Sequence, residues 1–133
     1  MKNLISVKVA ARGNLILLGL LAVFHLLVIG GIIPTTIIWG GRITDRGEAV
    51  RMELVSLMVV LLCGLITLAK AGYLKLQKGR IVITIGLWLM AVFFLMSTIG
   101  NLMAVTNTEK IIFTPIAVLC MLFSLRLAIE QDR

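Results

Sequence analysis

Four apolar runs constrain this chain more than any other feature of its sequence. They occupy residues 14–33, 54–74, 81–103 and 111–129, which are 20, 21, 23 and 19 residues long. An α-helix rises about 1.5 Å per residue, so about 20 residues cross a hydrocarbon core about 30 Å thick. The sequence therefore predicts a single transmembrane domain over residues 1–133, with an all-α fold: an integral membrane four-helix bundle.

The composition excludes a soluble domain. Hydrophobic residues make up 60% of the chain and charged residues 14%, whereas soluble domains are about 45–50% apolar and about 25% charged. A chain with so few charges cannot cover its surface with polar groups in water. The first run also exceeds the roughly 7–15 apolar residues of a secretory signal, and no A-x-A-like cleavage site follows it. We therefore interpret it as an uncleaved first span.

Basic residues are distributed unevenly around the four runs. Nine of the thirteen Lys and Arg residues lie near the N-terminus, around the connection between the second and third runs, or near the C-terminus. These nine are Lys2, Lys8, Arg12, Lys70, Lys75, Lys78, Arg80, Arg126 and Arg133. Because cytoplasmic segments carry the Lys/Arg excess, the sequence predicts an N-in/C-in topology. The excess favours contact with membrane lipids, through anionic headgroups on the cytoplasmic side. No nucleic-acid partner is expected, because no basic soluble domain remains.

The only long connection is the outer segment 34–53, which joins the first two runs and would form an extracytoplasmic cap. Its β-branched residues and its Gly40-Gly41 pair are typical of a short hairpin. Alternatively, the first helix continues through "PTTIIW", bends at Pro34 and ends at Gly40. We favour the continued helix, because an isolated hairpin is only marginally stable.

Six residues of this segment form a candidate outer-face patch for a ligand or a partner. They are Trp39, Arg42, Asp45, Glu48, Arg51 and Glu53. The tryptophan is also typical of an anchor at the membrane interface. The alternation of acids and bases equally fits a solvated collar of weak ion pairs, in which Glu48 and Arg51 are helical neighbours three residues apart. We favour the collar.

Polar residues inside the runs form a candidate intramembrane polar site, because a polar side chain in a bilayer is costly and usually functional. They are Asn14, His25, Thr67 and Asn101. Asn14 and His25 lie eleven residues apart, close to a whole number of turns, so both fall on one stripe of the first helix. Weakly polar residues on such stripes let membrane helices approach and hydrogen-bond. The sequence favours a seam between helices and leaves open whether His25 faces a cavity.

The two cysteines give a third candidate. Cys63 and Cys120 lie about 14 Å from the outer ends of their runs, close to His25 in depth, and thiolates with imidazole suit zinc or copper. Their spacing forms no metal motif, and free cysteine is a common apolar core residue. We therefore predict no metal and no cofactor. The sequence contains no motif of a catalytic nucleophile, metalloprotease or phosphate loop, so we predict no catalytic residue and no enzyme.

Local signals near the helix ends add detail. Thr106 and Glu109 have the spacing of a capping box at the start of the fourth helix. Pro115, two turns further on, would remove a hydrogen bond and either kink the helix or be tolerated near its end. Lys70 and Arg126, one turn inside the cytoplasmic ends of their runs, are expected to extend toward the membrane interface.

Several short motifs run along the chain. They are "IIWGGRI" from Ile37, "STIGNLMA" from Ser97, "EKIIFTP" from Glu109 and "LRLAIE" from Leu125. With them the chain resembles a family of small uncharacterised bacterial four-helix integral membrane proteins. The resemblance implies a multi-pass protein of the bacterial cytoplasmic (inner) membrane, which is the plasma membrane, and it carries no activity or site residue across.

Three functions remain open. We favour a non-enzymatic membrane protein that binds or organises a lipid or another membrane protein. The first alternative is a small homo-oligomeric transporter or channel, with His25 and Asn101 as interior polar groups and Glu53 at its outer mouth. The second alternative is a membrane redox or metal protein that uses His25, Cys63 and Cys120.

Overall fold

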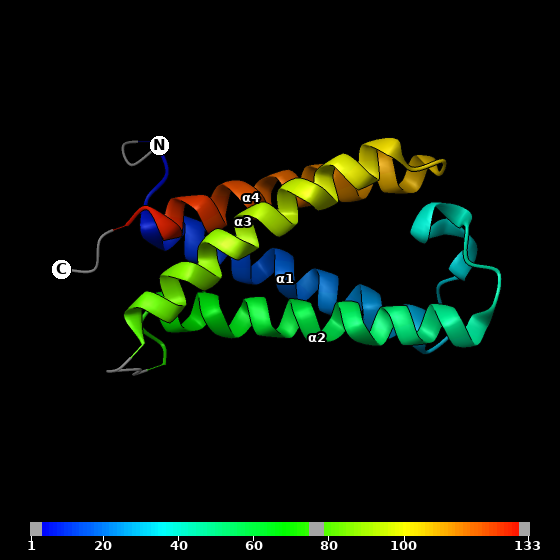
Figure 1. Ribbon diagram of the computed structural model, residues 1–133, viewed down its shortest axis with the longest axis horizontal. Coiled ribbons are helices and arrows are strands. Elements are labelled where there is room, and N and C mark those ends of the chain that lie inside the picture. The colour runs from blue at the N-terminus through cyan, green and yellow to red at the C-terminus, as the bar shows by residue number, and fades with distance from the viewer. Residues whose placement is uncertain (1–3, 75–78, 131–133) are drawn as a thin grey trace.

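The computed structural model describes residues 4–74 and 79–130 (Figure 1). Within these ranges the chain is helical and contains no strand. The elements are α1 (Val7–Ile29), η1 (Thr35–Ile37), η2 (Trp39–Gly41), α2 (Arg46–Lys70), α3 (Arg80–Met103), η3 (Glu109–Phe113) and α4 (Thr114–Ala128). Four helices, the last formed by η3 and α4 together, are long and apolar enough to cross a membrane. The predictions of an all-α fold and of four helices of transmembrane length are confirmed.

The first two helices begin seven and eight residues earlier than the apolar runs predicted. The Ser6 hydroxyl accepts a hydrogen bond from the amide of Val9 at 3.2 Å, and the Asp45 carboxylate accepts one from the amide of Glu48 at 2.7 Å. Such N-caps satisfy amides that have no partner in the first helical turn. Hydropathy marks where a helix is apolar, whereas the caps decide where it begins.

Residues 30–45, called the connecting segment below, are not a continued helix. α1 ends at Ile29, and the chain then forms the two short 3-10 turns η1 and η2. The predicted continuation to Gly40 is therefore wrong, and the alternative hairpin is wrong as well. Gly31 has φ 77°, in the left-handed region that suits glycine, and Pro34 is extended with φ −69° and ψ 143°. Together they turn the chain away from the axis of α1.

The fourth helix starts with a single π turn, η3. The amide of Thr114 donates to the carbonyl of Glu109, five residues earlier. Pro115 lies in the first turn of α4 and has no amide hydrogen to continue the regular helical ladder. The wider turn before it accommodates the proline near the helix end without a break.

The helices pack as two pairs, α1 with α2 and α3 with α4, and α1 also packs against α4. α2 and α3 meet where the first ends and the second begins: a Cβ added at Gly86 would lie 3.0 Å from Cδ1 of Ile66. Toward the opposite end α2 and α3 diverge (Figure 1). We call the end where α1 begins and α4 ends the closed half, and the other end the open half.

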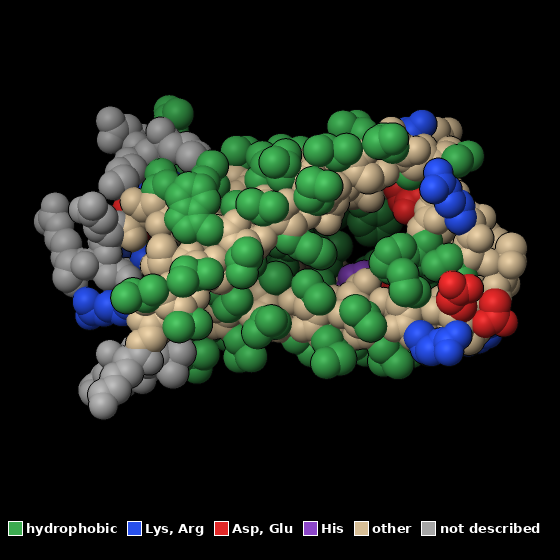
Figure 2. All heavy atoms as spheres, in the orientation of Figure 1, with side chains coloured by type: hydrophobic (Ala, Val, Ile, Leu, Met, Phe, Trp, Pro, Cys, Tyr) green, Lys and Arg blue, Asp and Glu red, His purple; other side chains and the backbone are tan. Residues whose placement is uncertain are grey.

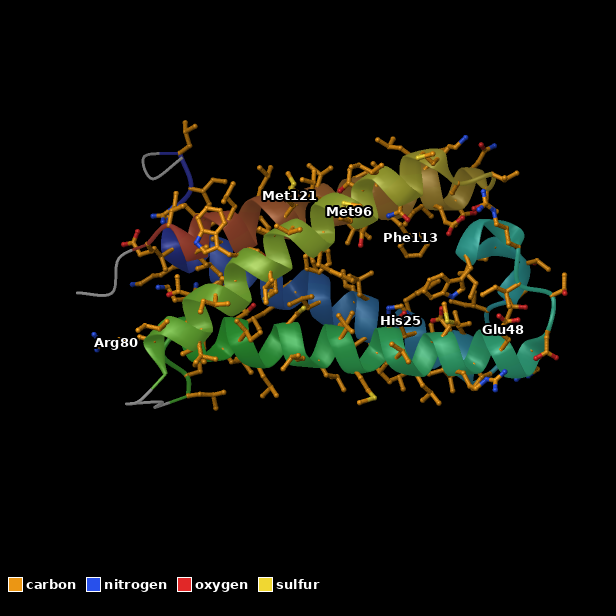
Figure 3. All side chains as sticks on the ribbon, viewed as in Figure 1. His25, Glu48, Arg80, Met96, Phe113 and Met121 are labelled. Atoms are coloured by element: carbon orange, nitrogen blue, oxygen red, sulfur yellow. The ribbon has the colours of Figure 1, made fainter. Side chains whose placement is uncertain are left out.

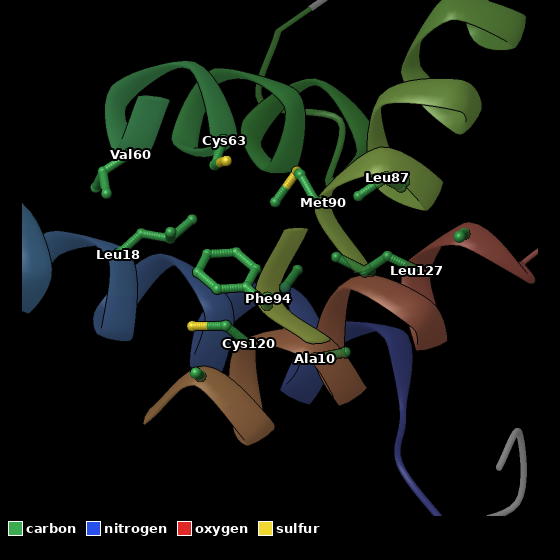
Figure 4. Packing of buried hydrophobic residues seen from close by; sticks show 12 residues of the cluster. Ala10, Leu18, Val60, Cys63, Leu87, Met90, Phe94, Cys120 and Leu127 are labelled. Carbon is green, nitrogen blue, oxygen red and sulfur yellow. The ribbon is translucent and has the colours of Figure 1, made fainter. Parts of the chain in front are cut away.

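The closed half contains a core of leucines and small residues (Figure 4). Ala10, Leu87 and Leu127 have no exposed surface. Gly13 lies so close to the ring of Phe123 that an added Cβ would stand 2.6 Å from its Cε2. Because lipid tails are as apolar as leucine, close packing of this kind is a main source of attraction between membrane helices. Small residues therefore hold α1 against α4 here.

Polar contacts join the helix ends in the closed half. Arg126 is buried; its Nε donates to the carbonyl of Ile5 at 2.7 Å and its Nη1 to the carboxylate of Glu130 at 2.8 Å. Lys70 donates to the Glu130 carbonyl at 2.9 Å. Arg126 therefore bonds to groups at the helix ends, and its extension toward the membrane interface stays a prediction.

Outward-facing side chains of the helices are mostly apolar (Figure 2). Met58 on α2 and Leu89 on α3 are 70% and 64% exposed. Contiguous apolar surface on this scale is unfavourable in water and suits acyl chains. The orientation in a membrane stays a prediction. Four of the nine basic residues on which it depends lie outside the described residues, namely Lys2, Lys75, Lys78 and Arg133.

Candidate functional site

A cavity of about 680 Å³ lies in the open half, lined by all four helices and by the connecting segment. Figure 2 shows it as a hollow between α3 and α2, with His25 visible at its floor. In Figure 3, His25 from α1 and Phe113 from the start of the fourth helix approach it from opposite sides. Ligand pockets are typically about 300–1,000 Å³. The cavity therefore has the volume of a site for a small molecule or for part of a lipid.

The floor of the cavity holds a buried hydrogen-bonded pair. Nδ1 of His25 lies 2.6 Å from Oε2 of Glu53, and the indole of Trp39 donates to Oε1 of Glu53 at 2.8 Å. Glu53 is 2% exposed, on the face of α2 that is turned into the bundle. An ionised carboxylate has no proton to donate, so beside ionised Glu53 the proton of the contact sits on Nδ1 of His25. In that tautomer, Nε2 of His25 carries no proton and can accept a hydrogen bond.

A second carboxylate lines the same cavity from η3. Both oxygens of Glu109 accept from the backbone amide of Gly40, at 3.0 and 2.9 Å, and one also accepts from the hydroxyl of Thr106. Thr106 and Glu109 thus contact each other through their side chains and not as the predicted capping box, and the carboxylate reaches across to the connecting segment. It joins that segment to the start of the fourth helix.

Trp39 and Gly40 therefore bridge two carboxylates that belong to different helices. Trp39 has φ 53° and is the only described non-glycine residue in the left-handed region; Gly40 and Gly41 follow with φ 66° and 68°. A left-handed conformation costs a non-glycine residue roughly 1–2 kcal/mol. The hydrogen bonds to Glu53 and Glu109 offset this strain, so the bridge and the carboxylates hold one another in place.

The cavity is also lined by polar side chains that have no hydrogen-bond partner among the described residues. Ser97 and Asn101 lie one turn apart on α3, and Ser56 lies one turn after Glu53 on α2. Among the described residues, the side chains of these three make no hydrogen bond within the protein. Arg42 also lines the cavity but is exposed at its rim. The cavity thus offers free donors and acceptors on two helices besides the imidazole of His25.

Aromatic side chains are concentrated at this cavity. It is lined by Phe24, Trp39, Phe93, Phe94 and Phe113, five of the eight aromatic residues in the chain. The rings of Phe24 and Phe113 meet edge to face, with centroids 4.7 Å apart. Aromatic walls with a few convergent polar groups are typical of ligand sites.

The candidate intramembrane polar site does not exist as one cluster. Asn14 donates to Thr67 at 3.1 Å and to Ser124 at 3.5 Å, and all three are buried away from the cavity. His25 and Asn101 line the cavity instead. Asn14 and Thr67 therefore form a seam between helices, as the stripes predicted, whereas His25 faces a cavity.

The candidate outer-face patch is also divided. Trp39, Arg42 and Glu53 line the cavity. Asp45 caps α2, while Glu48 and Arg51 are exposed on its first turns. The indole nitrogen of Trp39 is bonded to Glu53, and the role of Trp39 as a membrane anchor stays a prediction.

The candidate metal residues do not converge. No group of three or more His, Cys, Asp or Glu side chains that could hold a metal ion occurs among the residues that the structure describes. Cys63 and Cys120 are free thiols in the hydrophobic core, while His25 pairs with Glu53.

Sequence reasoning missed several residues of the site. The capping-box spacing predicts that Glu109 lies at a helix start and does not place it at a cavity, and no motif marks Ser97 or the phenylalanines. The usable signal was the spacing of Phe93, Ser97 and Gly100, which places all three on one face of α3. Comparison with known proteins gives no match to a protein-family model, to a curated protein or to a solved structure.

Proposed function

We propose that this protein binds an amphiphilic molecule that reaches its cavity from within the bilayer. The observation that supports this most directly is the opening of the cavity between α2 and α3 (Figure 2). Val55 on α2 and Phe93 on α3 line the cavity and are 60% and 45% exposed. The edges of the opening are therefore apolar. A molecule that enters between α2 and α3 can pass from the acyl chains into the cavity without crossing water.

The distribution of polarity in the cavity suits an amphiphile. Glu53 lies seven residues into α2, or about 10 Å along its axis, and His25 lies one turn before the end of α1. The polar groups are therefore near the end of the bundle, at the depth of a membrane interface. Val59, Val60 and Ala117 line the cavity further toward the closed half. A polar head beside His25 and a tail toward the bilayer interior would match both regions.

We propose binding rather than catalysis. The pair of His25 and Glu53 has the form of a general base with its orienting carboxylate. A hydroxyl or thiol nucleophile hydrogen-bonded to Nε2 of His25 is absent from the part of the chain that the structure describes. The imidazole is then available to a ligand.

Gly100 allows a direct test. It lines the cavity, and a Cβ added there would have no atom within 4 Å, so we expect Gly100→Leu to fold and to fill part of the cavity. Gly64 on α2 has the same free space but lies outside the cavity, which makes Gly64→Leu a matched control.

The assay measures binding of three probes with the same tail, dodecyltrimethylammonium, dodecanol and dodecyl sulfate, to the protein in lipid nanodiscs. We expect at least one probe to bind saturably at one molecule per chain, to lose this binding in Gly100→Leu and to keep it in Gly64→Leu. If neither substitution changes the binding of any of the three probes, the proposal is contradicted.

A transporter is the second candidate, because the cavity is accessible in the open half while Leu87 and Leu127 are packed in the closed half. A cavity open on one side is one state of an alternating-access cycle. Release on the other side would require the closed half to part. In liposomes, transport predicts probe flux that His25→Ala abolishes, whereas binding alone predicts saturation without flux.

A further inference from the structure

The cavity also indicates the class of its ligand, an inference that rests on the proposed binding function. Its buried charged groups are the carboxylates of Glu53 and Glu109, which are 2% and 8% exposed. His25 is the only other titratable group in the interior wall, and the guanidinium of Arg42 lies exposed at the rim. Even with His25 protonated, the buried wall carries one net negative charge when both carboxylates are ionised.

This charge discriminates between ligands. In a cavity of low dielectric, charges interact much more strongly than in water, and a buried charge without a partner is unfavourable. An anionic headgroup would place a further negative charge beside Glu53 and Glu109. A neutral head would leave the wall charge uncompensated, whereas a cationic head would neutralise it.

The aromatic wall is an independent observation with the same implication. The faces of aromatic rings attract cations, and cages of aromatic side chains recognise ammonium groups. Phe24, Trp39 and Phe113 belong to the same end of the cavity as the carboxylates: Trp39 is bonded to Glu53, Phe24 precedes His25, and Phe113 follows Glu109 within η3. Aromatic rings and acidic groups thus surround one space.

We infer that the ligand is a cationic amphiphile, with an amine or quaternary ammonium head held between Glu53, Glu109 and the aromatic rings. Its alkyl or aromatic body lies between α2 and α3. The ammonium can belong to a free lipophilic amine or to an ethanolamine headgroup of a phospholipid, since both carry an ammonium group.

The test ranks the three dodecyl probes in nanodiscs of phosphatidylglycerol. Trp88→Phe removes the exposed tryptophan of α3 and leaves Trp39, at the cavity, as the fluorescent reporter. We expect dodecyltrimethylammonium to bind at least about tenfold more tightly than dodecanol, and dodecyl sulfate not to compete. Equal affinities for all three probes, each lost in Gly100→Leu, would overturn the inference and leave the proposed function standing. If Gly100→Leu reduces the binding of none of the probes, the proposed function itself is contradicted.

Charge-neutralising variants sharpen the test. Glu53→Gln and, should it not fold, Glu109→Gln are expected to weaken ammonium binding about tenfold or more, while dodecanol affinity changes less than about threefold. Glu48→Gln, exposed on the same helix, is the control and should change neither. An equal loss for both probes in Glu53→Gln and Glu109→Gln would overturn the inference.

A final experiment distinguishes the two sources of the ammonium group, a free lipophilic amine and a phospholipid headgroup. Replacing part of the phosphatidylglycerol by phosphatidylethanolamine should lower the apparent affinity for dodecyltrimethylammonium if the headgroup occupies the cavity. Unchanged affinity would assign the site to free lipophilic amines. Either result supports recognition of an ammonium group.

Discussion

The two halves of the bundle differ in the interactions that join their helices. In the closed half, Leu87 and Leu127 are fully buried and Gly13 touches Phe123 across the helix interface. In the open half, α2 and α3 diverge, and hydrogen bonds from Trp39 and Gly40 to Glu53 and Glu109 join the helices. The comparison teaches that one bundle of four helices can be closely packed at one end and enclose a cavity at the other.

The largest expected effect belongs to the closed half. Leu127→Ala removes a fully buried side chain of α4, and such changes in protein cores cost about 2–5 kcal/mol. We expect a loss of this size in the free energy of unfolding, measured by denaturation in detergent micelles. Leu119→Ala, on the same helix but 42% exposed, should cost much less. Similar losses for both variants would mean that this half is not tightly packed.

An intermediate effect is expected for the bridge in the open half. Glu109→Ala leaves the amide of Gly40 without its acceptor, and an unsatisfied buried group costs about 1–3 kcal/mol. Hydrogen exchange should accelerate in residues 35–42 and stay unchanged around Leu87 in the closed half. Acceleration throughout the bundle would show that the two halves do not open independently.

The smallest effect concerns the backbone of the bridge. Gly40 has φ 66°, so Gly40→Ala should destabilise the protein by roughly 1–2 kcal/mol. Gly64→Ala, within α2 and free of close neighbours, should be neutral or stabilising by roughly 0.5–1 kcal/mol. The pair can be compared by thermal denaturation. Equal shifts of the two midpoints would contradict the strained conformation of the bridge.

The closed half was more predictable from the sequence than the open half. The lengths of the apolar runs depend only on bilayer thickness, and the stripe that contains Asn14 is a local helical pattern. The contact between His25 and Glu53 spans 28 residues and depends on how α1 and α2 are aligned, which the turns after Gly31 determine. A local sequence pattern cannot predict how α1 and α2 are aligned.

The cavity was also beyond local sequence patterns. Glu109 and Gly40 are 69 residues apart. Each also fits a local pattern, Glu109 a helix cap and Gly40 a glycine turn, so neither pattern indicates that the two residues meet. The sequence predicts similar depths for His25 and the two cysteines, but depth does not determine the direction in which a side chain points. The diverging helices direct His25 toward a cavity and both cysteines into the core.

The most direct test of a cavity that opens to the bilayer is quenching of Trp39 fluorescence by lipids brominated on their acyl chains, in the Trp88→Phe background. We predict strong quenching by brominated chains and weak quenching by aqueous iodide, with the brominated-chain quenching reduced in Gly100→Leu and kept in Gly64→Leu. Quenching by iodide alone, with no response to brominated chains, would contradict the account.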